Sequence, residues 1–257
     1  MIKISGNIAE TSSILSEFPE DTIRTIIIST MASSKEIYNY SSLNELKFEL
    51  TMRVNIVNAS RDLYKSGIKF KTFKESMCNE DYWERTENGG FLLREGIKAS
   101  EGINDIFKNG SKYGTECSTA VVIVYYKAIL DTYSEELFNK TFEKIFLVGW
   151  HYIDDDLDIL VYKSRVDYFP GDYRYFSNPE FDHKNSEWRG ENVIYLGDDT
   201  YYGHGIGIKP SKGIIIALNK HRKKGAKESA FLTDITGYPN FKRLAAIYYQ
   251  FLEGSRL

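Results

Sequence analysis

The sequence predicts an α+β fold in which a buried helix that carries a cysteine packs against an antiparallel sheet. Residues 121–126 (VVIVYY) are apolar on every side of a helix, and such a helix lies inside the protein. The clearest amphipathic helix pattern lies in the first half, whereas the second half holds short apolar runs separated by turn residues. We therefore expect one domain, residues 1–257, with a helix-rich N-terminal half and a strand-rich C-terminal half.

Composition narrows the classes of function. The chain has 257 residues, of which 42% are hydrophobic and 27% charged, and these are ordinary values for a globular protein. The net charge of −3 gives no general attraction to polyanions. No apolar run reaches the length of a transmembrane helix, and residues 1–5 (MIKIS) do not open a signal peptide. We expect no nucleic-acid partner, no membrane association and no cofactor.

The N-terminal elements are predicted in order as follows. Residues 2–8 suit a short edge strand or lead-in, and the β-branched run in residues 21–31 suits either a helix or a strand. Residues 43–66 are the clearest helix, because apolar residues recur along one face at helical spacing. Ser42 and Glu45 match a capping box at its start, and Gly67 is a natural stop.

The middle of the chain predicts a hairpin followed by helices and two buried strands. Residues 81–95 read as a β-hairpin with its turn at residues 88–90 (NGG). Residues 100–108 and 134–142 predict short helices, and the apolar runs in residues 145–150 and 157–162 predict strands. Between those strands, residues 154–158 (DDDLD) resemble the opening of a calcium loop. Ile159 and Arg165 occupy the positions that need glycine and glutamate, so we interpret the segment as a solvated turn without metal.

The last third predicts a second hairpin and a closing helix. Residues 193–196 and 201–208 flank a turn at residues 197–200 (GDDT). The basic run in residues 220–227 is typical of a solvated helix end, with attraction to an acidic protein surface as a second reading. Residues 240–253 predict an aromatic helix that packs on the body.

Cys117 is the candidate nucleophile. Thr115 is a plausible N-cap, which would place Cys117 in the first turn of the buried helix. The free amides and dipole of a helix N-terminus lower the pKa of a thiol and favour the reactive thiolate. The alternative is that Cys117 is only a buried small residue. Because the chain has just one other cysteine, Cys78, we expect at least one free thiol and no disulfide framework.

A second set of residues supports the nucleophile reading. Residues 187–194 (EWRGENVI), Glu116-Cys117 and residues 202–208 (YGHGIGI) together resemble the protein-glutamine gamma-glutamyltransferases (transglutaminases) of spore-forming bacteria. The resemblance extends to residues 52–57 (MRVNIV), 65–70 (KSGIKF), 150–152 (WHY) and 176–182 (FSNPEFD), in one colinear order over nearly the whole chain. It is weaker in the first forty residues, after residue 152 and in the last twenty-five.

This resemblance implies a fold and a set of site residues. The fold is a papain-like core, as in the NlpC/P60 cell-wall peptidases, with the cysteine helix facing a sheet that bears the base. The nucleophile would be Cys117 and the base Glu191, with Glu116 as a partly redundant second carboxylate. His204 and Asn192 would support the site, and Trp150, Trp188 and Phe70 would line a substrate tunnel.

Each of these residues also has an ordinary structural reading. Glu116 could be a carboxylate that stabilises the helix dipole, and Glu191 could form an ion pair with Arg189. By the logic of papain, His204 would be the base, or it could be a structural histidine. A glutamate base requires a raised pKa, which burial against aromatic rings or repulsion between two acids would supply.

The implied reaction joins a glutamine carboxamide to a lysine amine through a Cys117 thioester, with release of ammonia. The implied partners are glutamine- and lysine-bearing coat proteins of bacterial spores. The enzyme would be a calcium-independent monomer of the sporulating cell's cytoplasm and the spore coat. Two alternatives remain open: a cysteine peptidase or amidase on the same fold, and a coat component without activity.

Overall fold

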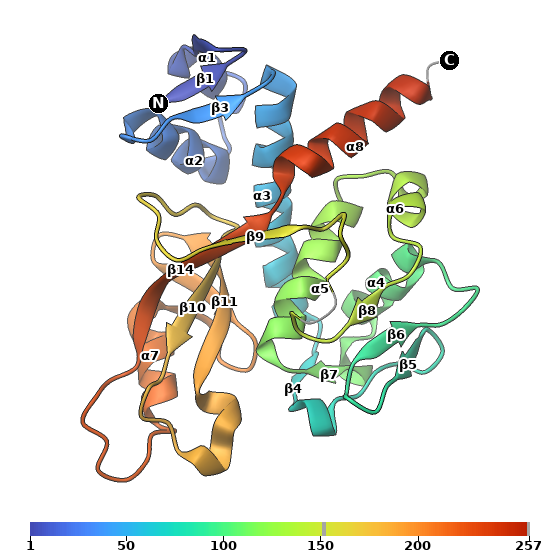
Figure 1. The fold of residues 1–257 in the computed structure, drawn as a ribbon, viewed down its shortest axis with the longest axis vertical. Helices are drawn as coiled ribbons and strands as arrows, with labels where there is room; N and C mark the ends of the chain where they lie inside the picture. Colours follow the sequence, from blue (N-terminus) through green and yellow to red (C-terminus); the bar gives the residue numbers. More distant parts are fainter. Residues whose placement is uncertain (151–152, 256–257) are drawn as a thin grey trace.

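The structure, a computed structural model, describes residues 1–150 and 153–255. Two helices, α3 (Leu43–Lys65) and α5 (Cys117–Leu130), pack against each other through the centre of the molecule. A six-stranded sheet lies on one side of this pair, and α4 (Ala99–Lys108), α6 (Glu135–Thr141) and a small sheet lie on the other (Figure 1). The predicted α+β class and the packing of the cysteine helix on an antiparallel sheet are confirmed.

The N-terminal region forms a small sheet with its own apolar cluster. Strands β1 (Ile2–Ile4), β2 (Asn7–Ile8) and β3 (Tyr38–Tyr40) pair in the order β2-β1-β3, beside α1 (Thr11–Leu15) and α2 (Thr22–Ser33). Residues 21–31, which suited either a helix or a strand, are helical. The Asp21 side chain accepts a hydrogen bond from the amide of Arg24 and caps the helix, and Ile27, Ile28 and Met31 are buried.

Helix α3 connects this region to the rest of the molecule. Its N-cap is Ser42, as predicted, but the Glu45 carboxylate bonds the amide of Ser41 rather than that of Ser42. Its buried face packs on α5 and on α8 (Phe241–Gly254). Within that face Arg53 is fully buried and forms ion pairs with Glu49 and Asp172. These pairs hold α3 against the start of the large sheet, because Asp172 directly precedes β10 (Tyr173–Ser177).

The middle of the chain wraps around α5. Strand β4 (Lys69–Phe70) pairs in parallel with β7 (Gly114–Thr115), and the predicted hairpin is formed by β5 (Trp83–Arg85) and β6 (Phe91–Leu93). The remaining elements are η1 (Phe73–Glu75), α4 (Ala99–Lys108), η2 (Gly110–Lys112), α6 (Glu135–Thr141) and β8 (Phe146–Leu147). The predicted strand at residues 145–150 shrinks to β8, since Gly149 adopts a φ of +58° and turns the chain.

The large sheet is antiparallel and has the strand order β13-β12-β11-β10-β14-β9. Its other strands are β9 (Ile159–Tyr162), β11 (Gly190–Gly197), β12 (Thr200–Gly203), β13 (Gly207–Pro210) and β14 (Phe231–Pro239). The predicted hairpin is β11–β12, but residues 201–208 do not form one strand. They turn at residues 204–206, because Gly205 and Gly207 adopt φ values of +96° and +92°, and β13 then pairs back onto β12.

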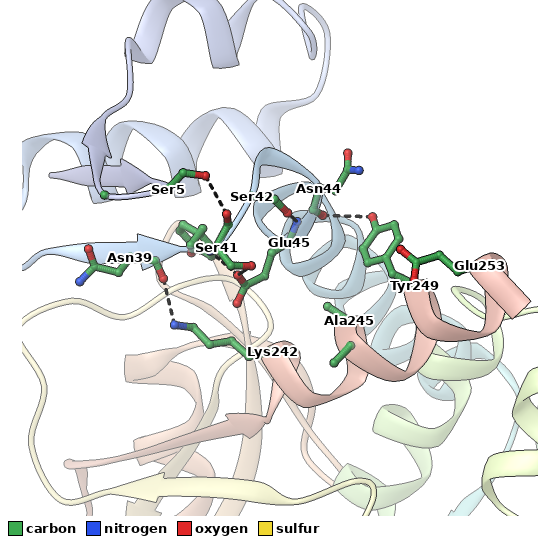
Figure 2. A pocket seen from close by; sticks show the side chains of 13 residues that line it. Ser5, Asn39, Ser41, Ser42, Asn44, Glu45, Lys242, Ala245, Tyr249 and Glu253 are labelled. Atoms are coloured by element: carbon green, nitrogen blue, oxygen red, sulfur yellow. Dashed lines mark hydrogen bonds between the residues drawn. The ribbon is translucent and has the colours of Figure 1, made fainter.

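The final elements are η3 (His183–Trp188), α7 (Ser211–Asn219) and α8. Helix α8 confirms the predicted C-terminal helix. The acidic residues 154–158 stabilise its start rather than only facing solvent: Asp156 pairs with Arg243, and Asp158 accepts a hydrogen bond from Asn240. Figure 2 shows α8 against the start of α3, where the Tyr249 hydroxyl donates to the carbonyl of Asn44.

Two properties of the described residues bear on function. None of their helices is both long enough and apolar enough to cross a membrane. Within residues 1–150 and 153–255, no three His, Cys, Asp or Glu side chains are grouped as metal ligands would be.

Candidate active site

Cys117 is the first residue of α5, and only 8% of its surface is exposed. The helix is capped by Glu116 and not by Thr115, which lies in β7 and pairs with Phe70 of β4. The Glu116 carboxylate accepts hydrogen bonds from the amides and hydroxyls of both Ser118 and Thr119. The prediction that Thr115 caps the helix is therefore wrong. Glutamate is a less usual cap than threonine, but here two hydroxyls add to the two amides.

The direct partner of the sulfur is Asn192 on β11. Its side-chain nitrogen donates to Cys117 Sγ at 3.0 Å, and the main-chain amide of Asn192 also faces the sulfur. The hydroxyl of Tyr173, on the adjacent strand β10, donates to Asn192 Oδ1 at 2.9 Å. That bond makes Oδ1 the acceptor and leaves the NH₂ group for the sulfur, so it determines which way the amide points.

Strand alternation explains why Asn192, rather than Glu191, meets the cysteine. Asn192 shares a face of β11 with Ile194, which belongs to the core around α5. Glu191 shares the other face with Val193, which packs in a separate apolar cluster beside α7. The sequence placed both residues in the site, but only the sheet shows that Asn192 contacts the sulfur.

Glu191 is nevertheless an unusual carboxylic acid. It is 1% exposed, and its Oε1 has no hydrogen-bond partner among the described residues. Burial, and then the charge of Glu116, raise the pKa of Glu191 well above its ordinary value. This is the direction that a glutamate base requires. The ion pair with Arg189, which was the alternative interpretation of Glu191, is absent from the ion pairs of the described residues.

The pKa of the Cys117 thiol is shifted in the opposite direction from the prediction. Burial, followed by the charges of Glu191 and Glu116, raises the pKa of Cys117, and the two bonds from Asn192 only partly oppose this. The pKa is therefore not lowered as the helix position predicted, and Glu116 already occupies the amides of Ser118 and Thr119. A thiol and an acid that both resist ionisation are suited to exchanging one proton between them.

His204 is buried and fully engaged away from the sulfur. Its Nε2 lies 3.1 Å from the carbonyl of Lys69, and its Nδ1 lies 3.1 Å from the hydroxyl of Tyr202. Because a carbonyl only accepts, the proton belongs on Nε2, and Nδ1 accepts from Tyr202. Burial lowers the pKa of His204, so the neutral ring is favoured. These two contacts connect β4 to the end of β12, so they give His204 a structural role.

Aromatic rings from three parts of the chain gather near these residues. The Phe70 ring lies 5.6 Å from that of Trp188 and 6.1 Å from that of His204. Trp188 in turn stacks on His221, with ring centres 3.8 Å apart and planes 1° apart. Trp150 meets the edge of Tyr173 at 5.0 Å. The structure thus brings the three predicted tunnel residues to the elements that carry the site, whereas His151 and Tyr152 of the same motif lie outside the described residues.

Cys78 has none of these features. It is half-buried, and burial together with Glu80 raises the pKa of Cys78 to about 11. Both cysteines are free thiols.

The chain is similar to known proteins over most of its length. The family described as "Protein-glutamine gamma-glutamyltransferase" matches residues 1–248. The chain belongs to this family. A protein-glutamine gamma-glutamyltransferase of Bacillus cereus is 50% identical over 208 residues, which cover 81% of this chain and 75% of that protein. One of Bacillus anthracis is 49% identical over the same coverage.

A solved structure shows the same fold. The transglutaminase from Geobacillus stearothermophilus, without its C-terminal extension, superposes with a TM-score of 0.77 at 44% identity, covering 80% of this chain and 98% of that one. The resemblance inferred from the motifs is therefore confirmed, and this chain is a transglutaminase.

Sequence reasoning missed three residues of this transglutaminase site: Tyr173, Gly203 and His221. A Cβ added to Gly203 would lie 3.0 Å from Glu191 Oε1, so this glycine leaves room for the carboxyl. Gly203 lies inside the motif of residues 202–208, but no motif or spacing in the sequence indicated Tyr173 or His221. Their partners, Asn192 and Trp188, are 19 and 33 positions away along the chain and meet them only in the fold.

The surface hollow drawn in Figure 2 is separate from this site. It has a volume of about 710 Å³ and lies between β3, the start of α3 and α8. Among the described residues, no cysteine or histidine lines it. This hollow therefore does not mark the candidate active site.

Proposed function

We propose that this transglutaminase crosslinks glutamine and lysine side chains of spore coat proteins, without calcium, through a Cys117 thioester and with Glu191 as the acid and base. The observation that carries the proposal is the buried carboxyl of Glu191. Its Oε1 has no hydrogen-bond partner in the part of the chain that the structure describes, and its charge acts on the Cys117 thiol. The motif resemblance and the named Bacillus relatives support the crosslinking reaction. The assignment of spore coat proteins as substrates rests on the motif resemblance alone.

In the first half-reaction the thiol proton moves toward Glu191 as Sγ attacks the carboxamide carbon. A C–S bond forms, the C–N bond breaks, and the nitrogen takes a proton from Glu191 and leaves as ammonia. The two N–H donors of Asn192 favour negative charge on the sulfur. The charge of Glu116 disfavours it, which keeps the thiol protonated until a substrate arrives.

In the second half-reaction a lysine amine attacks the thioester. A C–N bond forms, the C–S bond breaks, and Glu191 accepts the proton that the amine loses. Water competes with the amine at this step. The rings of Phe70, Trp150 and Trp188 support an apolar wall that excludes it, as the resemblance implies for a tunnel.

The contacts of Glu116 and His204 favour positioning roles. Glu116 accepts hydrogen bonds from four groups of the first turn, and protonation would weaken them. His204 is held by Lys69 and Tyr202, which argues against a papain-type histidine base. A share of the base role for Glu116 remains a prediction.

The proposal also covers the type of core, the oligomeric state, the cellular location and the independence from calcium. We propose a papain-like core, supported by α5 packing on β11, and a single-domain monomer in the cytoplasm of the sporulating cell and in the spore coat. Calcium independence is supported by the contacts of Asp156 and Asp158, which bind Arg243 and Asn240.

The test is incorporation of a fluorescent primary amine into casein, in the presence of EDTA. The wild type is compared with Cys117→Ala, Glu191→Gln and His204→Ala. We expect no incorporation with Cys117→Ala, a severe loss with Glu191→Gln and a smaller loss with His204→Ala. Repeating the assay with extracted spore-coat protein tests the substrate class.

Other outcomes would support the alternatives. Release of glutamate or peptide fragments without amine incorporation, lost with His204→Ala, would favour a peptidase or amidase. Activity that EDTA abolishes and calcium restores would overturn calcium independence. No turnover on casein or coat protein would leave a coat component without activity.

A further inference from the structure

The amide side chains of this enzyme are distributed in a way that bears on its own reaction. The chain has 15 asparagines and a single glutamine, Gln250, although it has 21 glutamates and 22 lysines. Asparagine and glutamine carry the same carboxamide and differ by one methylene. A general avoidance of amides therefore does not explain the difference, because only the amide that the enzyme attacks is reduced to a single residue.

The single glutamine lies in a regular helix. Gln250 is exposed on α8, which spans Phe241–Gly254, and it is flanked one turn away by Ile247 and Glu253. A helix with its side chains is about 10–12 Å across. For Gln250 to reach a sulfur that is 8% exposed, a second molecule would have to accept the whole helix next to Cys117. An extended loop presents a glutamine without that bulk.

Gln250 also cannot reach the sulfur of its own chain. Helix α8 contacts the first turn of α3, where Tyr249 bonds Asn44. Strand β4 follows the other end of α3 and pairs with β7, which leads directly into the cysteine at the start of α5 (Figure 1). With 23 residues, α3 spans about 34 Å at 1.5 Å per residue. Any donation by Gln250 would have to occur between two molecules.

Lysines, the other substrate side chains, are plentiful at the surface. Most of the 22 are exposed, among them Lys65, Lys98, Lys112 and Lys223. Such amines are suitable acceptors for a thioester.

We propose that this enzyme is refractory as an acyl donor in its own reaction and takes part only as an acyl acceptor, through its lysine amines. Copies are then not linked to one another through glutamine, and the enzyme is joined to crosslinked material through its lysines. The inference rests on the proposed transamidation. It names a class of partner for covalent attachment: proteins that present glutamine in extended segments.

The test uses the purified full chain in EDTA with two probes. The first is dansylcadaverine, an amine that labels reactive glutamines, and the second is a biotin-tagged, amino-blocked glutamine dipeptide, which labels lysines. We expect the wild type to take up the dipeptide on several lysines, to take up almost no dansylcadaverine and to remain a single band on denaturing gels.

Two loop variants supply the positive comparison. Ser164 lies in the exposed loop after β9, and Lys224 lies in the exposed loop after α7. We expect Ser164→Gln or Lys224→Gln to approach one dansylcadaverine per chain and to form covalent oligomers when no amine is added. The matched Ser164→Asn and Lys224→Asn variants should behave like the wild type.

The outcomes separate the inference from the proposed function. If casein incorporates dansylcadaverine but neither loop variant does, the scarcity of glutamine is not what protects the enzyme, and the inference is overturned. Labelling of wild-type Gln250 to the level of the loop variants overturns it equally. If casein is not labelled either, the proposed transamidation has failed first.

Discussion

Asn192 Nδ2 donates to the sulfur of Cys117 at 3.0 Å, while the Tyr173 hydroxyl holds the other side of the same amide at 2.9 Å. The sulfur therefore meets a donor whose orientation is set by a third residue. The charge of the neighbouring Glu191 raises the thiol pKa, and within residues 1–150 and 153–255 its Oε1 has no hydrogen-bond partner. In the proposed mechanism, the asparagine positions and stabilises the sulfur, and the glutamate exchanges a proton with it.

Removing the asparagine donor should slow formation of the thioester. We expect Asn192→Ala to lower kcat/KM for amine incorporation about 10- to 100-fold, since a hydrogen bond to a charged group contributes about 1.5–3 kcal/mol. The pH at which iodoacetamide half-maximally labels Cys117 should also rise, because the thiolate loses its donor. An unchanged labelling profile would show that the bond does not act on the sulfur.

Loss of the Tyr173 hydroxyl should produce a weaker form of the same defect. Tyr173→Phe leaves the ring that packs on Trp150 but frees the Asn192 amide to turn over. We expect a several-fold fall in kcat and a rise in the labelling pH of Cys117. The control is Tyr133→Phe, which also loses a buried hydroxyl contact, to the carbonyl of Leu244, far along the core. Equal effects of Tyr173→Phe and Tyr133→Phe would show that the Tyr173 hydroxyl contributes to stability and not to the orientation of Asn192.

A methyl group at Gly203 should disturb the carboxyl directly. The added Cβ would lie 3.0 Å from Oε1 and 3.1 Å from Cγ of Glu191, closer than ordinary contacts. We expect Gly203→Ala to reduce kcat/KM at least about 10-fold, a loss of about 1.4 kcal/mol in transition-state stabilisation. Gly254→Ala, where a Cβ meets nothing within 4 Å, is the matched control. Activity retained by Gly203→Ala would show that Glu191 need not stay where the structure places it.

The buried acid should make stability fall with rising pH. Burial raises the pKa of Glu191 in the folded state, whereas the unfolded value is about 4.3. Between those two values the folded chain binds more protons than the unfolded chain, so the free energy of unfolding decreases as pH rises. Glu191→Gln removes this titration. The Tm of this variant relative to that of the wild type should therefore increase with pH. Each kcal/mol of difference in the free energy of unfolding corresponds to about 2–4 °C in Tm.

The measurement is thermal unfolding of both proteins between about pH 5 and pH 9, the window in which a raised Glu191 pKa acts. Glu84→Gln, at an exposed position of β5, controls for loss of a surface charge. A constant difference between wild type and Glu191→Gln across this range would mean that Glu191 titrates normally.

Glu116 combines two effects that substitutions can separate. Glu116→Ala removes the cap of α5 and should lower the free energy of unfolding by about 1–2 kcal/mol. It also removes a charge that raises the thiol pKa, so the labelling pH of Cys117 should fall. Ser42→Ala, which uncaps α3, should give a comparable loss of stability without moving the labelling pH. Abolished turnover in a well-folded Glu116→Gln variant would point instead to a direct share in proton transfer.

Much of the fold was predictable because it depends on neighbours in the chain. The periodic apolar residues of α3, its Ser42 cap and the all-apolar face of α5 are local patterns, and the structure has them where expected. The break after β12 was missed because an alternating run does not show where glycines adopt positive φ. The cap of α5 was misplaced by one residue, because Thr115 is taken into a strand pair with Phe70 from a distant part of the chain.

The identity of the chemical groups, a cysteine at a helix start with glutamates, an asparagine and tryptophans in family motifs, was readable from the sequence and led to the right family. Their mutual arrangement was not. Adjacent strand residues point to opposite faces, so only the register of β10, β11 and β12 decided that Asn192 contacts Cys117 while Glu191 lies over Gly203. The pKa values followed from that arrangement, because burial and nearby charge are properties of the folded surroundings and not of the residues themselves.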